Sequence, residues 1–459
     1  MSLSSKLEAE YRSTHKTSEK IHQRAVQVMP TGIETDARYL MPFPFYIQRA
    51  EKARKWDVDG NEYLDAWSGH GALILGHNHP KVVAAVQEQA KKGFHYSSCH
   101  ETQVEMAELM VKLIPCAEKI RYIQSGAEAN ALAIRVARAY TGKNKFIKFR
   151  GHFHGYFDEG VMAIRPPFDV PMSIGVPQAS LSNVLLARHN HSEDVQCLID
   201  GAANDVACVI IDPSGAHNLV LGNKSGFLEE VRRITQEKKV ILIFDEVVSG
   251  FRLAPGGAQE VLGVTPDLAT VAKPMGGGLP ASALVGRRDI MDTMTMTGDR
   301  DHDRFHRVIS QGTHSGNPMA MAAGLATLKL LENGEPQKYI NRLGKILRKS
   351  LNEVIKKHDV PGCAYGNWSI VHIFLGEECP IRRDCDRTTC LHPDHEKLDL
   401  YGSVKVRSNL RMAMLLNGVD YLGGFGLMFL NAAMTDQDIE KITNSFDLSL
   451  KRLKEEKIL

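Results

Sequence analysis

The sequence predicts an α/β fold in which helices cover both faces of a mostly parallel central sheet. Between about residues 117 and 290, short apolar segments alternate with amphipathic segments, a pattern that is typical of parallel strands joined by crossover helices. The chain has 459 residues, enough for several domains and a large core. We expect a large central domain over residues 70–330 and a smaller α+β domain built from residues 1–69 together with residues 331–459.

Six segments of the central region have the composition of buried strands, because each is short, rich in Val, Ile or Phe, and bounded by Gly, Pro or Asp. They are residues 120–124, 145–149, 207–212, 240–247, 268–272 and 281–286. Residues 127–141 are expected to form a helix, since apolar side chains recur there every three or four positions and Gly142 stands at the stop position. In the smaller domain we expect helices over residues 1–29, 335–357 and from about Asp436, and strands over residues 45–66, 369–375 and 425–431.

The charge balance disfavours several classes of partner. The chain has 56 Lys and Arg residues against 54 Asp and Glu residues, so it has no long-range field that would attract nucleic acid or an anionic membrane surface. We find no run of about 18 apolar residues that could cross a bilayer, and no apolar leader at the N-terminus. Five of the eight cysteines are scattered singly, unlike those of a disulfide-stapled secreted protein. We therefore expect a cytoplasmic protein without nucleic-acid or membrane partners.

Two of the expected strands are followed by turns that suit a ligand, at the edge where open parallel sheets bind theirs. After residues 120–124, the turn Ser125-Gly126-Ala127 opens directly into a helix, whose free N–H groups and dipole suit a phosphate; a plain helix cap is the alternative. After residues 145–149, Phe153 stands between two glycines and can lay its ring over a planar ligand. The alternative there is a buried Phe with two solvated histidines.

Charged residues end two further strands. Asp245 emerges from a fully apolar strand, and a buried carboxylate needs a cationic or hydrogen-bonding partner. A protonated heterocyclic nitrogen would serve, and an Asp that caps the next turn is the alternative. Lys273 stands alone at the end of residues 268–272, where a partly desolvated amine can act as a Schiff-base nucleophile. The glycines that follow it lack the G-x-G-x-x-G spacing of a dinucleotide site.

Together, these four features supply what one cofactor needs. Pyridoxal 5′-phosphate requires an amine to hold its aldehyde, an acid to keep its ring nitrogen protonated, flat walls for its ring and amide donors for its phosphate. The combination is more specific than any one of the features. It therefore predicts a site for pyridoxal 5′-phosphate built from successive strand ends.

With these residues the chain resembles the class III aminotransferases of fold type I, and within them the glutamate-1-semialdehyde aminomutases and the β-amino-acid transaminases. The resemblance runs from about residue 20 to residue 445. It rests on the segments WDVDGNEYLDAWSG (56–69), ILGHNHP (74–80), SGAEAN (125–130), FHG (153–155), IFDEVVSGFR (243–252), PDLATVAKPMGGGLP (266–280) and QGTHSGNP (311–318). It implies a fold type I transferase with a mostly parallel central sheet.

The resemblance also implies a role for each candidate around the ring. Lys273 would form the Schiff base with the cofactor and later carry the proton. Asp245 would hold the pyridine nitrogen, and Phe153 and Val247 would lie on the two faces of the ring. These residues are the catalytic and ring-binding candidates of the chain.

Phosphate, subunit and substrate contacts follow from the same resemblance. Ser125, Gly126 and Ala127 would hold the phosphate. Thr313, in the G-T-x-S-G-N-P segment, would reach the phosphate of a neighbouring subunit, which implies a homodimer. Arg38 stands about where the family places an arginine for the substrate carboxylate, with a surface arginine as the alternative.

Departures from the family pattern bear on the reaction. Ala127 lacks the hydroxyl of the threonine often found there, and Asp212 with Pro213 replaces a Glu-Pro pair, so that the role of this acid stays open. Gly426 stands where the aminomutases have a glutamate, and His70 where they have a tryptophan near the active site. We therefore predict a transaminase that moves an amino group from an amino acid or amine to a keto acid or aldehyde. An intramolecular aminomutase is the alternative, and a non-catalytic cofactor-binding protein or a Rossmann dehydrogenase is less favoured.

One polar segment, residues 376–400, has no place in this interpretation. It contains Cys379, Cys385, Cys390, His392 and His395, and thiolates with an imidazole can close a tetrahedral zinc site. No C-x2-C pair is present and the spacing is irregular. We therefore expect no metal and favour a solvated loop.

Overall fold

A computed structural model describes residues 3–215, 222–376, 404–424 and 426–459. The chain folds into two compact units, described in turn: unit 1 comprises residues 1–79 and 338–459, and unit 2 comprises residues 80–337. Our expected domain boundaries placed residues 70–79 with the large domain and residues 331–337 with the small one. In the structure, residues 70–79 belong to unit 1 and residues 331–337 belong to unit 2.

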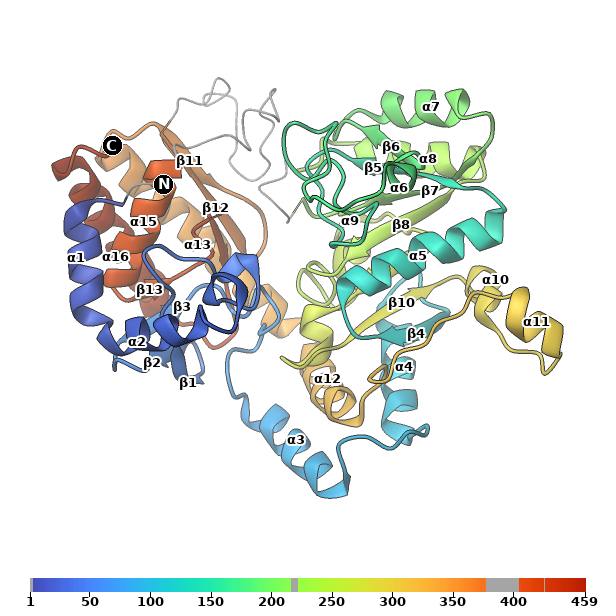
Figure 1. Ribbon diagram of the computed structural model, residues 1–459, viewed down its shortest axis with the longest axis horizontal. Coiled ribbons are helices and arrows are strands. Elements are labelled where there is room, and N and C mark those ends of the chain that lie inside the picture. Colours follow the sequence, from blue (N-terminus) through green and yellow to red (C-terminus); the bar gives the residue numbers. More distant parts are fainter. Residues whose placement is uncertain (1–2, 216–221, 377–403, 425) are drawn as a thin grey trace. The chain divides into compact units, whose positions relative to one another are not determined.

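Unit 2 is built on a seven-stranded sheet with the strand order β4-β10-β9-β8-β7-β5-β6 (Figure 1). The strands are β4 (Lys119–Ile123), β5 (Lys145–Phe149), β6 (Val184–Ala187), β7 (Val206–Ile211), β8 (Ile241–Glu246), β9 (Leu268–Val271) and β10 (Ser282–Gly286). Only β10 runs antiparallel to its neighbours, β4 and β9, and the other pairs are parallel. The predicted mostly parallel sheet is confirmed, and β6 is the strand that we did not predict.

The helices of unit 2 are α3 (Pro80–Lys92), α4 (Glu101–Leu113), α5 (Gly126–Thr141), α6 (Gln178–Leu181), α7 (Ser192–Gly201), α8 (Phe227–Glu237), α9 (Gly257–Leu262), α10 (Arg288–Met291), α11 (Arg300–Phe305) and α12 (Pro318–Leu331), with the 3-10 turns η3 (Lys273–Gly276) and η4 (Asp292–Met294). Helix α5 packs against β7, β9 and β10, and α8 packs against β8. The expected helix over residues 127–141 is therefore present. It ends where predicted, because Gly142 takes the left-handed conformation at its C-cap, with φ of 68°.

Unit 1 has the expected α+β character. Its elements are α1 (Ser5–Thr14), α2 (Lys16–Ala25), η1 (Pro30–Gly32), η2 (Asp36–Arg38), β1 (Ile47–Glu51), β2 (Arg54–Asp57), β3 (Glu62–Asp65), α13 (Glu335–Lys357, whose first turn belongs to unit 2), β11 (Gly362–Tyr365), β12 (Ile370–Leu375), α15 (Val404–Leu416), β13 (Val419–Asp420), β14 (Leu427–Phe429) and α16 (Asp436–Glu455). Its sheets have the orders β1-β2-β3-β13 and β11-β12-β14. Both chain ends contribute to one apolar core, with members such as Leu7, Leu347, Met414 and Phe446.

The single N-terminal helix expected over residues 1–29 is wrong, because the structure divides it at His15. Asp59, from the turn between β2 and β3, accepts hydrogen bonds from the backbone N–H groups of Thr17 (2.6 Å) and Ser18 (2.9 Å) and so caps a second helix. His15 itself is buried and contacts the Tyr63 hydroxyl at 2.6 Å. No helix in the described parts of the chain is both long and apolar enough to span a bilayer.

Candidate active site

The carboxyl ends of β7, β8 and β9 place polar side chains next to one another. Ile211 pairs with Phe244, and Asp245 pairs with Thr270. Continuing the same register by one residue sets Asp212 beside Asp245. Residues that are in register on neighbouring parallel strands point to the same face of a sheet. The row Asp212, Asp245 and Thr270 therefore lies at the edge where we expected the ligand.

The Asp245 carboxylate is buried, and hydrogen bonds from several described residues hold it. Its Oδ2 accepts from Asn130 Nδ2 at 2.8 Å and contacts His154 Nδ1 at 2.7 Å, and its Oδ1 accepts from the Val247 N–H at 3.1 Å. Thr270 Oγ1 donates in turn to Asn130 Oδ1 at 2.6 Å. The alternative in which Asp245 only caps a turn does not describe this network, which orients one carboxylate from three segments of the chain.

The two histidines of the loop after β5 are not solvated, so that alternative is wrong. His152 and His154 are 0% and 2% exposed. Burial lowers the pKa of His154 more than the neighbouring Asp245 raises it, which favours the neutral ring with its Nδ1 proton directed at the carboxylate. His152 Nδ1 accepts the N–H of Asp212 at 3.2 Å. Both rings therefore belong to the framework of the site.

Ser125 begins α5 with a capping box. Its Oγ accepts the Glu128 N–H at 3.3 Å, while Glu128 Oε2 accepts from the Ser125 N–H and hydroxyl at 2.9 and 2.7 Å. The hydroxyl is thus engaged within the helix end. Gly126 and Ala127 are the first two helical residues, whose N–H groups have no acceptor within a helix. The turn can therefore offer a phosphate mainly backbone donors.

Glycines let the ring segments approach this turn closely. A Cβ added to Gly126 would lie 2.7 Å from Val247 Cγ2, and one added to Gly155 would lie 2.5 Å from Ala127 Cβ. The loop that carries Phe153 and the strand end that carries Val247 thus both pack on the helix start. Phe153 and Val247 are both partly exposed on these segments. Backbone donors, two apolar side chains and the fixed acid Asp245 are the groups that pyridoxal 5′-phosphate requires.

Lys273 follows β9 and begins η3 with φ of 45°, a left-handed conformation that is uncommon for a lysine. Burial lowers its pKa to about 8, against the opposing effect of Asp245 and Asp212, and Arg252 lowers it further. A pKa near 8 leaves a usable fraction of neutral amine at neutral pH. Burial therefore favours the neutral amine of Lys273, the form that a Schiff-base nucleophile needs.

Asp212 remains an acid of the site despite its short side chain. It is 1% exposed, and its Oδ1 accepts from the Ser214 N–H at 2.9 Å and hydroxyl at 2.7 Å. Burial and the adjacent Asp245 raise its pKa to about 7, against Ser214 and Lys273. The Asp-Pro departure thus keeps a titrating carboxyl next to Asp245.

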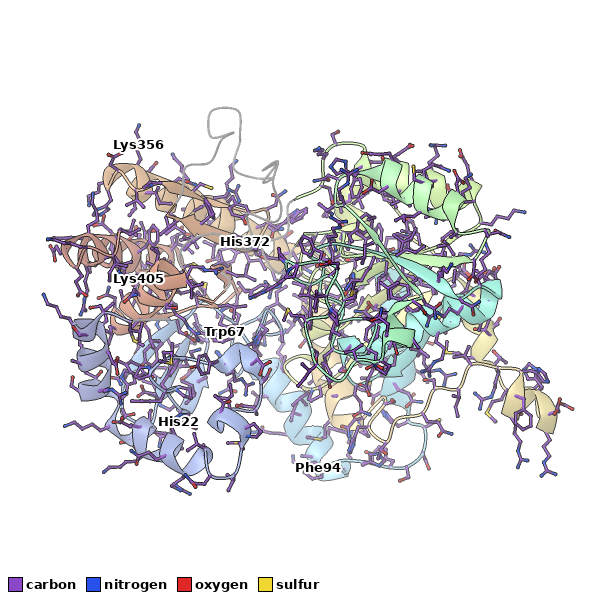
Figure 2. All side chains as sticks on the ribbon, turned by 45° about the horizontal axis from the view of Figure 1, so that its top comes forward. His22, Trp67, Phe94, Lys356, His372 and Lys405 are labelled. Carbon is purple, nitrogen blue, oxygen red and sulfur yellow. The ribbon has the colours of Figure 1, made fainter. Side chains whose placement is uncertain are left out.

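The remaining candidates lie at the surface or in unit 1. Thr313 is exposed in unit 2, and its carbonyl oxygen contacts His95 Nε2 at 2.6 Å. Arg38 is exposed in unit 1 and forms an ion pair with Glu34. His70 is partly buried in unit 1, and the centroid of its ring lies 4.8 Å from that of Trp67, which is labelled in Figure 2. The cysteines and histidines of residues 379–395 lie outside the described residues.

The sequence did not single out Asn130, His154 and Thr270, which form the hydrogen-bond network around Asp245. Asn130 could have been found, because it follows Gly126 and Ala127 by four and three residues, the spacing that places side chains on one helix face. The roles of His154 and Thr270 depend on hydrogen bonds to residues far away in the sequence. Their own segments carry no comparable signal.

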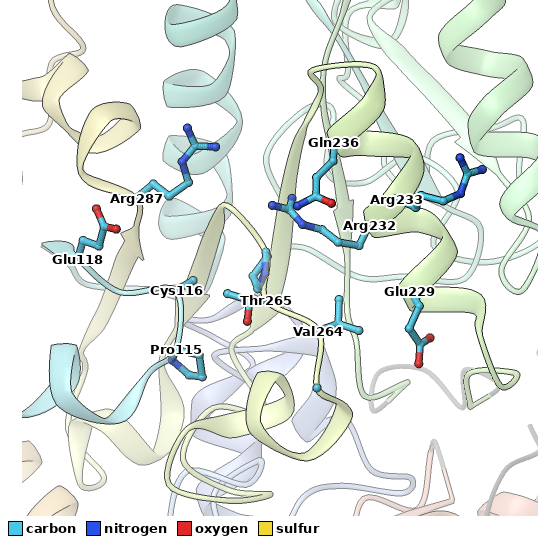
Figure 3. A pocket seen from close by; sticks show the side chains of 12 residues that line it. Pro115, Cys116, Glu118, Glu229, Arg232, Arg233, Gln236, Val264, Thr265 and Arg287 are labelled. Atoms are coloured by element: carbon cyan, nitrogen blue, oxygen red, sulfur yellow. The ribbon is translucent and has the colours of Figure 1, made fainter.

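A pocket of about 490 Å³ lies elsewhere in unit 2 (Figure 3). Its lining includes Pro115, Cys116 and Glu118, which precede β4, and residues 263–266, which precede β9. It therefore lies at the opposite edge of the sheet from Lys273. Its arginines are neutralised, since Arg232 and Arg287 bind Asp267 and Arg233 binds two glutamates. This pocket has no part in the candidate site.

Comparisons with known proteins agree with the geometry. Residues 35–368 match the family Aminotransferase class-III. A glutamate-1-semialdehyde 2,1-aminomutase from Methanothermobacter thermautotrophicus is 40% identical over 365 residues, which cover 79% of this chain and 84% of that relative. An omega-transaminase structure from Sphaerobacter thermophilus matches with a TM-score of 0.87 and 29% identity over 97% of this chain and 99% of that one.

A transaminase structure with pyridoxal phosphate bound also matches, with a TM-score of 0.85 and 27% identity over 96% of this chain and 99% of that one. The Rossmann alternative is thereby excluded, since these relatives share one fold over nearly the whole chain. This chain belongs to the class III aminotransferases of fold type I, and pyridoxal 5′-phosphate is its cofactor.

Proposed function

We propose that this chain moves an amino group on a small amino compound and that Lys273 holds the aldehyde of the cofactor. One observation carries the proposal: a lysine with a pKa of about 8, a fixed acid and a helix start lie at the same edge of one sheet, after β9, β8 and β4. Bound pyridoxal phosphate supplies an electron sink for the bond that breaks at the amino-bearing carbon. The protein must supply the groups that hold the cofactor and the group that moves the proton.

Each protein group has a separate task in this proposal. Lys273 Nζ would hold the aldehyde carbon of the cofactor and, as a neutral amine, could take and return a proton. Asp245, buried and held by Asn130 and His154, would keep the proton on the ring nitrogen. The N–H groups of Gly126 and Ala127 bind the phosphate at the positive end of the α5 dipole.

Two reactions share these tasks and differ in where the amine goes. The curated relative at 40% identity is an aminomutase, which supports amine transfer within one substrate. We adopt this aminomutase-type reaction as the better supported of the two. It replaces the transaminase as our preferred interpretation of the sequence.

Transfer between two substrates is the second candidate, and specific observations favour it. His70 and Gly426 depart from the aminomutase pattern, and the omega-transaminase structure matches over 97% of the chain. Different residues at these two positions favour a different substrate from that of the aminomutases. The two reactions therefore need a direct test.

Glutamate-1-semialdehyde offered alone to the purified, cofactor-loaded protein separates the candidates. An aminomutase converts it with no second substrate, and the product is followed by NMR. A transaminase needs an added keto acid, and ¹⁵N from a labelled amino donor then appears in the acceptor product. Turnover that strictly requires a keto acid would overturn the aminomutase assignment, and the Lys273→Ala variant is the inactive control.

We further propose that the active unit is a homodimer. Thr313 is exposed, and its segment adjoins residues 94–96 through His95 and through the bond of 3.1 Å from Asn317 Nδ2 to the Phe94 carbonyl. Phe94 itself is 65% exposed (Figure 2). An exposed aromatic side chain beside Thr313 supports an interface at this place.

A further inference from the structure

A fully buried lysine outside the assigned site requires an explanation. Lys148 lies in β5, is 0% exposed, and has buried neighbours in Ile147 and Phe149. Lysine is almost never fully buried unless its amine is paired. Both hydrogen bonds of Lys148 Nζ go to main-chain carbonyl oxygens, that of Gly160 at 2.9 Å and that of Met162 at 2.5 Å. The side chain thus crosses from a strand to a later segment of the chain.

That segment is the far end of the loop that carries Phe153 and His154. The loop leaves β5 and returns beside it, where the Gly151 N–H donates to the Ala163 carbonyl at 2.8 Å. A Cβ added to Gly160 would lie 2.8 Å from the Gly155 carbonyl oxygen, so the returning segment packs on the FHG turn. Lys148 therefore fixes the base of this loop.

The other end of the loop meets the candidate site directly. Gly155 packs against Ala127, and the carbonyl of His154 accepts from Asn130 Nδ2 at 2.9 Å. The His154 ring contacts Asp245 at 2.7 Å. A shift at the base of the loop would thus reach both the phosphate turn and the acid.

We propose that Lys148 is a positioning residue whose two hydrogen bonds clamp the loop of residues 151–163 and thereby set the places of Phe153 and His154. The inference rests on the proposed function only in assuming that Phe153 and His154 lie beside the cofactor. The clamp itself belongs to the protein without cofactor. A lysine is suited to this task because either protonation state of its amine has at least two N–H donors.

Burial lowers the pKa of Lys148 to about 7, against an opposing effect of Asp245. Since the neutral amine still has two donors, the clamp holds on both sides of that pKa. A methionine of similar length fills the space but leaves two buried carbonyl groups without a donor. Lys148→Met is therefore the informative substitution, and Lys145→Met on the same strand, where the side chain is partly exposed, is its matched control.

The test measures hydrogen exchange of the full chain without cofactor, followed by titration with pyridoxal phosphate. In Lys148→Met, we expect peptides from residues 151–163 to exchange roughly tenfold faster, peptides from α5 and β8 to keep their rates, and the Kd for the cofactor to rise about tenfold. Lys145→Met should match the unchanged protein. Lys148→Gln, which retains two donors on a shorter side chain, should lie between them.

Unchanged exchange over residues 151–163 would overturn the proposal, as would an equal increase in every peptide, which indicates general destabilisation. If the unchanged protein failed to bind pyridoxal phosphate, the proposed function would be wrong. The exchange rates of residues 151–163 would still test whether Lys148 clamps the loop. The two outcomes are therefore distinguishable.

Discussion

Three buried charged residues at the strand ends influence one another's proton affinity. Asp212 has a pKa raised to about 7 by burial and by Asp245, and Lys273 has a pKa lowered to about 8, mainly by burial. The ionised Asp212 favours the protonated amine of Lys273, and the protonated Lys273 favours the ionised carboxylate of Asp212. The charge on Lys273 therefore depends on whether Asp212 is ionised.

Replacement of Asp212 by Asn tests this coupling. Below about pH 6, Asp212 already holds its proton, so the variant and the unchanged protein should attach pyridoxal phosphate at similar rates. Above pH 7, the ionised Asp212 stabilises the Lys273 ammonium, and its removal should raise the attachment rate about twofold or more. The measurement is the rate of cofactor attachment, read by absorbance from pH 6 to 9. Profiles that coincide throughout would contradict the coupling, and Asp200→Asn, an exposed site, is the control.

At this scale, the sequence predicts the residues that stand directly at strand ends and misses their partners. Lys273 and Asp245 stand out because each is the charged residue that ends an apolar strand. Lys148 also interrupts an apolar strand, but its acceptors, Gly160 and Met162, offer only main-chain carbonyls. Every residue has such a carbonyl, so no side chain in the sequence marks the partner.

The loop after β5 depends on one close approach between elements. Gly155 has φ of 119°, and a Cβ there would lie 2.5 Å from Ala127 Cβ. Gly155→Ala should therefore push the loop away from the start of α5, weaken cofactor binding about tenfold or more, and lower the unfolding temperature. Calorimetry and cofactor titration measure both effects.

Gly142→Ala is the matched control for the loop. Gly142 has φ of 68°, and a Cβ there would meet nothing within 4 Å. This substitution should cost only the conformational strain, about 1–2 kcal/mol, and leave cofactor affinity unchanged. Equal affinities in the two variants would show that the approach of Gly155 to Ala127 does not shape the site.

In unit 1, a buried ion network joins β2, β3 and β13. Lys55 Nζ contacts Asp65 at 3.2 Å and also binds Asp420. Burial opposes the charge on Lys55, but Asp420 and Asp65 outweigh it and raise its pKa. Burial likewise opposes the charge on Asp65, but Lys55 and His77 outweigh it and lower its pKa.

Lys55→Met should destabilise the protein by about 3–5 kcal/mol at pH 7, because two buried carboxylates lose their cation. In the unchanged protein, the lowered pKa of Asp65 means that stability from this group is present above pH 4 and is lost as the pH falls further. The variant should lose less stability on acidification. Urea unfolding at pH 7 and at about pH 2.5 measures both effects, with the exposed Lys20→Met as control. A change below 1 kcal/mol would contradict this role.

Elements with strong apolar patterns are predicted best. Residues 335–357 form the expected helix, and the expected strand over residues 145–149 is β5. The single helix over residues 1–29 fails because the cap that divides it, Asp59, comes from a distant turn. The edge strand β6 has only one fully buried residue, so its four residues give too weak a signal.

At the scale of the whole molecule, the proposed homodimer can be tested directly. Sedimentation at micromolar concentration should give about twice the chain mass of 50.9 kDa. Phe94→Asp should shift the protein to monomer. It should also weaken cofactor binding, because Thr313 of each subunit would no longer reach the phosphate of the neighbouring subunit. Leu448→Asp, at another exposed apolar residue, should leave both properties unchanged. A monomer that binds the cofactor with undiminished affinity would contradict the composite site.

The central claim is that Lys273 is the residue that bonds to pyridoxal phosphate. The direct measurement is borohydride reduction of the cofactor-loaded protein, followed by proteolysis and mass spectrometry of the modified peptide. We predict that the modification lies on Lys273 and disappears in Lys273→Ala. Modification of another lysine, such as the buried Lys148, or no modification of the loaded protein, would contradict the account.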